Sequence, residues 1–216
     1  MIAWNEIETV LLDMDGTLLD LHFDNYFWQE YLPGKWGEIH ALDQETAKSR
    51  LIPRFREMAG TLSWYCVDFW SQELDIDVMA LKSDIEHLIQ IRPHSITLLQ
   101  FLRDIRKPVV MVTNAHEKLI GMKMDKTRID RYFDQIFCAH RLGAPKEDPV
   151  FWKRLSEELM FSPKNTLLID DNLTVLHTAR AFGVGHLLTI AQPDSQSPQR
   201  VVREFPAIES FEQLLD

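Results

Sequence analysis

Two aspartates, Asp13 and Asp15, stand two positions apart directly after a short apolar run near the start of the chain. Two carboxylates this close repel each other and stay ionised only beside a positive charge. Mg²⁺ is the natural candidate, because it prefers hard oxygen ligands and is commonly held by one or two carboxylates together with phosphate oxygens. One carboxylate could then attack phosphorus, and the other could act as general acid and base. Gly16 follows at once and supplies the backbone freedom that a turn needs.

Three further polar positions occur later in the chain, each at the end of an apolar run or just before a helix. The Thr113 hydroxyl and the N–H groups that follow it, from Asn114 onward, could hold a phosphoryl oxygen. Lys146 could neutralise charge that develops on that group. Asp170 and Asp171 could supply another acid for the metal. Each feature alone also fits an ordinary turn, an exposed lysine or a helix cap, but the whole set in this order is hard to obtain by chance.

The elements that must position these residues follow from hydrophobic periodicity. Short apolar runs that end at polar residues predict buried strands at 10–12, 108–113 and 165–170, and a weaker strand at 186–190. Amphipathic segments between them predict helices at 95–105, 148–160 and 173–184, and a short strand and helix close the chain at 207–215. Alternating strands and helices predict a doubly wound parallel α/β sheet, in which ligands bind at the carboxyl ends of the strands.

Residues 19–92 break this alternation. They contain no convincing buried strand, and their apolar spacing is helical. We therefore expect a helical cap at 19–92, inserted into a catalytic core of 1–18 and 93–216. Most of the cap's aromatic side chains should form its own core. At least one should face the cleft, from among Phe23, Tyr26, Trp28, Trp36 and Trp64.

Composition limits the class of protein. The chain has 216 residues, 45% of them hydrophobic, and a formal net charge of −10. A chain this acidic is a poor general binder of nucleic acid, because it would repel the phosphate backbone, and we expect no nucleic-acid partner. No run approaches the length of a membrane helix, and the first residues do not resemble a secretory signal. Cys66 and Cys138 are far apart and fit no metal or disulfide spacing, which favours a reducing compartment. We expect a cytoplasmic protein that binds no membrane, and we predict no protein partner.

The motifs together resemble those of the haloacid dehalogenase-like hydrolases. The pattern is carried by Asp13-Met14-Asp15-Gly16-Thr17, Thr113, Lys146 and Asp170-Asp171, and the insert resembles the family's helical C1 cap. The resemblance covers nearly the whole chain and implies a Rossmann-like core. It implies that Asp13 is the nucleophile and Asp15 the general acid and base. It further implies a phosphoryl site of Met14, Gly16, Thr113, Asn114 and Lys146, and a Mg²⁺ site of Asp13, Asp15 (through its backbone carbonyl), Asp171 and Asp170.

The chain departs from the family pattern at two places. Glu147 follows the lysine where proline is usual, and Asp170 and Val175 stand where the fourth motif has glycine and its last acid. The acidic residues of the fourth motif thus stand at other positions in this chain. Asp171 is our first choice of metal ligand, and Asp170 is the second. A second aspartate two positions after the nucleophile is typical of the family's phosphatases and argues against carbon–halogen chemistry.

Within the family, the whole chain resembles nucleotidases that act on purine 5′-monophosphates, including their Trp-rich insert. This implies hydrolysis of GMP and IMP, with a purine nucleoside monophosphate as the small phosphorylated ligand. Two other reactions stay open: a phosphatase for another metabolite, such as a sugar phosphate or phosphoglycolate, and a β-phosphoglucomutase-like phosphomutase. A catalytically idle binding module is disfavoured, because it would not need Asp13, Asp15, Thr113 and Lys146 together.

Overall fold

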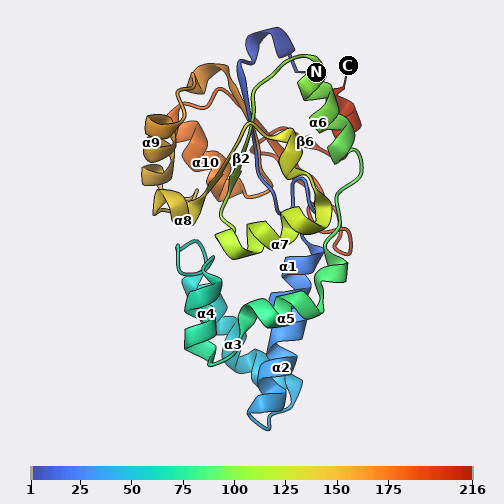
Figure 1. The fold of residues 1–216 in the computed structure, drawn as a ribbon, viewed down its shortest axis with the longest axis vertical. Coiled ribbons are helices and arrows are strands. Elements are labelled where there is room, and N and C mark those ends of the chain that lie inside the picture. Colours follow the sequence, from blue (N-terminus) through green and yellow to red (C-terminus); the bar gives the residue numbers. More distant parts are fainter. Residues whose placement is uncertain (1, 216) are drawn as a thin grey trace.

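A six-stranded parallel sheet lies at the centre of the computed structural model, which describes residues 2–215 (Figure 1). The strand order is β3-β2-β1-β4-β5-β6, and every pair is parallel. The predicted doubly wound α/β class is therefore confirmed. The strands are β1 (Thr9–Leu12), β2 (Val109–Thr113), β3 (Gln135–Cys138), β4 (Thr166–Ile169), β5 (His186–Ile190) and β6 (Ala207–Ile208).

Helices cover both faces of the sheet because its strands are apolar on both sides. Val10 and Leu12 of β1 pack into one hydrophobic cluster, and Leu11 between them packs into another. The first cluster includes α6 (Ser95–Asp104), α7 (Glu117–Thr127) and the 3₁₀ turn η6 (Phe211–Leu214). The second includes α8 (Ala139–Leu142), α9 (Pro149–Glu158) and α10 (Leu173–Phe182), on the opposite face (Figure 1).

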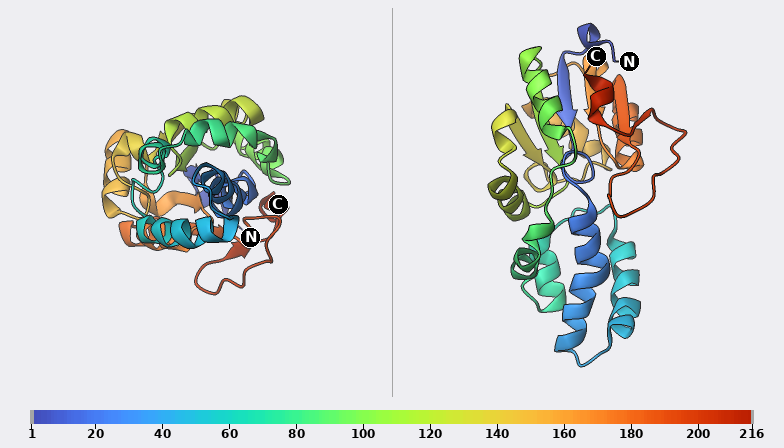
Figure 2. Two further views of the ribbon diagram at one scale, coloured as in Figure 1. Left: turned by 90° about the horizontal axis from the view of Figure 1, so that it is seen from below. Right: turned by 90° about the vertical axis from the view of Figure 1, so that its right-hand side faces the viewer.

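The segment from Leu21 to Gln90 contains helices and turns and no strand. Its helices lie beyond the carboxyl ends of the sheet strands (Figures 1 and 2). We use "cap" for residues 19–92 and "core" for 1–18 and 93–216, the division that we propose from the sequence. The cap elements are α1 (His22–Tyr26), the π-helical turn η2 (Phe27–Tyr31), α2 (Leu32–Ile39), α3 (Gln44–Met58), α4 (Val67–Leu74), α5 (Val78–Asp84) and the 3₁₀ turn η3 (Glu86–Leu88).

Three core elements, β3, α7 and the four-residue α8, were absent from the sequence prediction. The edge strand β3 has only two buried residues, Phe137 and Cys138, and its short "QIFC" run carries little strand signal. Helix α7 is weakly amphipathic because a lysine, Lys123, occupies its buried face. Short 3₁₀ turns also occur at η1 (Trp4–Glu6), η4 (Asp130–Tyr132) and η5 (Pro163–Asn165). Among residues 2–215, no helix combines the length and apolar character that a bilayer crossing requires.

Candidate active site

The polar ends of three adjacent strands meet at one edge of the sheet. β1 pairs with β2 on one side and with β4 on the other, with Leu12 aligned to Met111 and to Ile169. The residues that follow or end these strands, Asp13, Thr113 and Asp170, therefore lie side by side. This edge is the switch point of the sheet, because the chain leaves β1 for β2 and β3 and returns to β4 on the other side of β1.

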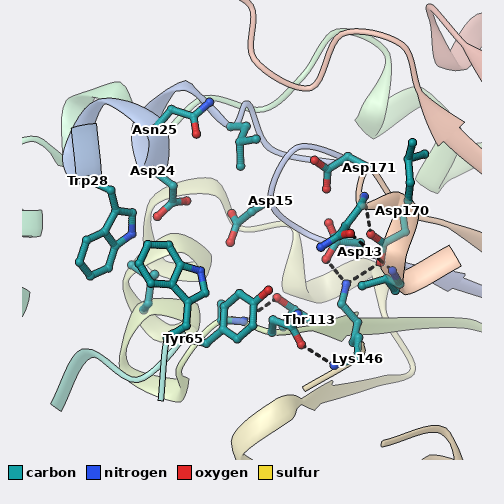
Figure 3. Close-up of a pocket in the computed structure, with 18 of the residues that line it drawn as sticks. Asp13, Asp15, Asp24, Asn25, Trp28, Tyr65, Thr113, Lys146, Asp170 and Asp171 are labelled. Carbon is teal, nitrogen blue, oxygen red and sulfur yellow. Dashed lines mark hydrogen bonds and ion pairs between the residues drawn. The ribbon is translucent and has the colours of Figure 1, made fainter. Parts of the chain in front are cut away.

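Lys146 holds two of the predicted aspartates together (Figure 3). Its Nζ donates to Asp13 Oδ1 at 2.5 Å and to Asp170 Oδ2 at 2.6 Å. All three side chains are buried. Burial raises the pKa of Asp13 to about 6, although the Lys146 charge opposes this rise. Burial alone would lower the pKa of Lys146, but the two carboxylates raise it above its ordinary value. The two carboxylates therefore favour the charged form of Lys146 beside Asp13.

A carboxylate cluster fits the requirements of Mg²⁺. Asp13, Asp170 and Asp171 each offer an oxygen within 4.8 Å of the others. Asp13 Oδ2 is buried and has no hydrogen-bond partner among the described residues. Burial, together with Asp13 and Asp170, raises the pKa of Asp171 well above its usual range. A divalent cation would relieve both the unpaired oxygen and the mutual repulsion, and an all-oxygen donor set suits Mg²⁺.

Gly16 makes room for one of these acids. Its φ is +82°, and a Cβ on it would lie 2.7 Å from the Asp171 carboxyl carbon. The Gly16 N–H donates to Leu19 O, so it serves the turn. Both Asp170 oxygens accept hydrogen bonds, from Lys146 Nζ and from the Asn172 N–H. Asp171 therefore remains our first choice of metal ligand in this motif.

Asp15 lies in a different electrostatic environment. Its Oδ1 accepts a hydrogen bond at 2.6 Å from Lys123 Nζ, which also donates to Asp24 Oδ2 at 2.6 Å. Asp24 Oδ1 in turn accepts from Lys82 Nζ at 2.8 Å. Burial raises the pKa of Asp15 to about 6, and Lys123 opposes this. Asp15 is not among the carboxylates clustered with Asp13, so its side chain is free of the candidate metal site and faces the cap.

Glu147, the residue that replaces the family's proline, links the cap to two motifs of the core. It accepts hydrogen bonds from Tyr65 Oη at 2.6 Å, from Asn114 Nδ2 at 2.8 Å and from Asn172 Nδ2 at 3.0 Å. The Asn114 side chain also accepts from the Lys146 N–H at 2.8 Å. The hydrogen bonds of Glu147 and Asn114 thus hold the loop that carries Lys146 in place.

A cavity of 390 Å³ lies between these motifs and the cap (Figure 3). Its core wall includes Asp13, Asp15, Thr113, Asn114, Lys146, Asp170 and Asp171. Its cap wall includes Asp24, Asn25, Trp28, Trp64, Tyr65 and Lys82. Trp28 and Trp64 pack against each other with ring centroids 5.0 Å apart. The expectation that at least one cap aromatic faces the cleft is confirmed by these two tryptophans.

Most of the predicted site residues thus meet in one place, with two differences. The Gly16 N–H, predicted for the phosphoryl site, already donates to Leu19 O. The Met14 side chain is fully buried in the hydrophobic core, so only its backbone can contribute to a phosphoryl site. Sequence reasoning missed Asp24, Tyr65, Lys82 and Lys123. For Lys123 one signal existed: it follows Leu119 by four positions, which places a lysine on the buried face of α7.

Comparisons with known proteins agree with this geometry. A family model described as haloacid dehalogenase-like hydrolase matches residues 7–183. The GMP/IMP nucleotidase YrfG of Escherichia coli is 35% identical over 214 residues, which cover 99% of this chain and 96% of that protein. A phosphoglycolate phosphatase of Neisseria gonorrhoeae is 25% identical, covering 95% and 93%. The crystal structure of a HAD phosphatase from Thermococcus onnurineus matches with a TM-score of 0.78 at 21% identity, covering 96% of each chain.

Proposed function

Because this chain belongs to the haloacid dehalogenase-like hydrolases, we propose that it is a Mg²⁺-dependent phosphomonoesterase that cleaves purine 5′-monophosphates, GMP and IMP, to nucleoside and phosphate. One observation carries the chemical part of the proposal. Asp13 and Asp15 line the same cavity, but Asp13 lies beside Lys146 and the acidic cluster, whereas Asp15 pairs with Lys123 on the cap side. Two carboxylates in different surroundings can take two different roles.

In the first step, a carboxylate oxygen of Asp13 attacks phosphorus and the bond from phosphorus to the ester oxygen breaks. Asp15 gives its proton to that oxygen, so the nucleoside leaves as a neutral alcohol and an aspartyl-phosphate remains. Lys146 and the Thr113 hydroxyl stabilise the negative charge on the phosphoryl oxygens. Asp13, Asp171 or Asp170 and the Asp15 backbone carbonyl would hold Mg²⁺, which would supply further charge neutralisation when bound.

In the second step, Asp15 takes a proton from water, the water oxygen attacks phosphorus, and phosphate leaves Asp13. Asp15 needs a pKa near neutrality for both roles, and burial raises it in that direction. The cap excludes other water while the phospho-enzyme exists, with Tyr65 bonded to Glu147 across the cleft.

The purine part of the proposal depends on the cap. Trp28 and Trp64 line the cavity, and a purine base can stack on an aromatic ring. The similarity to the E. coli GMP/IMP nucleotidase supports this assignment. The 390 Å³ cavity is larger than a two-carbon acid phosphate would fill, which favours a nucleotide over the phosphoglycolate suggested by the more distant relatives.

The test is phosphate release from a panel of monophosphates with excess Mg²⁺. We expect GMP and IMP to be hydrolysed with a far higher kcat/KM than CMP, UMP, phosphoglycolate or glucose phosphates. Equal rates on purine and pyrimidine nucleotides would remove the purine assignment. Isomerisation of a sugar phosphate without net phosphate release would show a phosphomutase instead.

A further inference from the structure

A second cluster of metal-ligating side chains lies outside the active site, where the cap meets the core. Cys66 precedes cap helix α4, His116 precedes core helix α7, and His140 belongs to core helix α8. One ligand atom from each lies within 4.8 Å of those from the other two. The proposed reaction uses none of the three, so their convergence needs a separate explanation.

The surroundings of the two histidine rings favour the binding of a ligand. Both ring nitrogens of His140 are shielded from solvent and have no hydrogen-bond partner among the described residues. An unpaired buried polar group costs about 1–3 kcal/mol, so a ring with two of them is unusual unless something binds it. The His116 ring lies 4.6 Å away, centroid to centroid, in an edge-on arrangement with an interplanar angle of 69°. The two imidazoles therefore converge on the same small space as the Cys66 thiol.

We propose that Cys66, His116 and His140 form a binding site for a transition-metal dication of the Zn²⁺ type that bridges the cap and the core. One thiolate and two imidazoles suit Zn²⁺ and do not suit Mg²⁺, which prefers oxygen. In a filled tetrahedral zinc site the ligand atoms are about 3.5 Å apart, and the three atoms here already lie within 4.8 Å of one another.

Asp68 offers a fourth ligand from the cap. Its Oδ1 accepts a hydrogen bond from Lys118 Nζ at 2.6 Å, whereas its Oδ2 lies 3.8 Å from His116 Nε2. If His116 binds the metal through Nε2, its ring proton must lie on Nδ1. Nδ1 would then lose only the long 3.3 Å hydrogen bond that it accepts from the Lys118 N–H. The site therefore has three protein ligands and a fourth position for Asp68 or water.

The position of the site gives it a consequence for the cap. Cys66 directly follows Tyr65, whose hydroxyl already bonds to Glu147 of the core. A metal that joins Cys66 to His116 and His140 would hold this edge of the cap closed over the cavity. Substrate entry and product release both require such a cap to open, so an occupied site would slow turnover.

The test uses Co²⁺, a spectroscopic substitute for Zn²⁺, titrated into the reduced full-length protein with excess Mg²⁺ present. We expect one equivalent to give a thiolate-to-cobalt absorption band and the visible bands of a tetrahedral site, both removed by Zn²⁺. Cys66→Ser should lose the thiolate band completely, and serine can still cap α4. His140→Ala should weaken Co²⁺ binding by at least about tenfold, the lower end of the cost of losing even an outer-shell partner.

Cys138→Ser is the matched control, because Cys138 is the other free thiol and also caps a helix. It should keep the thiolate band. Absence of the band in the unsubstituted protein, or its survival in Cys66→Ser, would overturn the site. The clamp rests on the proposed phosphatase activity, whereas the spectra do not. Zn²⁺ should slow the unsubstituted enzyme at saturating Mg²⁺ and should slow Cys66→Ser much less; equal inhibition of both would overturn the clamp.

Discussion

Replacement of Lys123 by methionine should damage both stability and catalysis. Lys123 is about 1% exposed, and its ammonium group makes ion pairs of 2.6 Å with Asp15 and with Asp24. Methionine keeps much of the volume but removes the charge. Asp24 retains Lys82 at 2.8 Å, whereas Asp15 loses the cation that faces it. The variant thus leaves a buried carboxylate uncompensated, at the position that we assign to the general acid and base.

The expected loss of stability is about 3–5 kcal/mol, the cost of removing one partner from a buried ion pair. For a chain of this size that corresponds to a fall in Tm of roughly 6–20 °C. The loss should depend on pH. Without Lys123 the pKa of Asp15 rises further above its value in the unfolded chain, about 3.9. The folded state then binds that proton more tightly, so the variant should lose more stability at pH 8 than at pH 5.5.

Urea unfolding at the two pH values measures these changes, and kcat with excess Mg²⁺ measures the effect on Asp15. We expect kcat to fall by at least about tenfold, a part of the 10²–10⁴-fold that general acid–base catalysis contributes. Lys126→Met is the matched control on the same helix, since Lys126 makes an exposed 3.3 Å pair with Glu86 that contributes about 0–1 kcal/mol. Equal effects of the two substitutions would refute the assigned role of Lys123.

Three other perturbations probe the metal and the cap. Chelation of divalent ions should abolish phosphate release, and added Mg²⁺ should restore it. Ca²⁺ should not restore it, because its looser coordination would displace the attacking carboxylate. Full activity in excess chelator would contradict the metal site. Gly16→Ala places a Cβ 2.7 Å from the Asp171 carboxyl carbon. The Mg²⁺ concentration needed for half-maximal activity should therefore rise steeply. An unchanged Mg²⁺ concentration would argue against Asp171 as a metal ligand. Trp64→Ala should lower kcat/KM for GMP by roughly 5- to 150-fold, from about 1–3 kcal/mol of stacking, and should change p-nitrophenyl phosphate hydrolysis far less. Trp36→Ala, a cap tryptophan outside the cavity wall, is its control, and equal losses on both substrates would leave Trp64 with a packing role only.

The core of the fold and of the site was predictable because its signals are local. Apolar runs that end at Asp13, Thr113 and Asp170 mark strand and functional residue in the same few positions. The doubly wound pattern then requires the carboxyl ends of these strands to meet at one edge. The acidic cluster of Asp13, Asp170 and Asp171 follows from this without any knowledge of the cap.

The residues that sequence reasoning missed depend on contacts between distant segments. Lys123 pairs with Asp15 and Asp24, which are 108 and 99 positions away in the sequence. No residue close to Lys123 in the sequence predicts either partner. Its charge also weakens the amphipathic pattern of its own helix. Tyr65 and Glu147 are 82 positions apart, and the sequence shows Glu147 only as a departure from the family pattern. Packing of the cap on the core creates these pairs, so only the structure shows them.

The most direct test of the account is to trap phosphate on Asp13 in the Asp15→Asn variant with p-nitrophenyl phosphate. This substrate has a good leaving group, so its cleavage does not need a proton from Asp15, whereas hydrolysis of the aspartyl-phosphate still needs Asp15 as base. We predict a burst of about one p-nitrophenol per enzyme molecule, followed by slow turnover, with the phosphoryl group found on the peptide that contains Asp13. Steady release without a burst, with no phosphate on Asp13 after acid quenching, would contradict the nucleophilic role of Asp13.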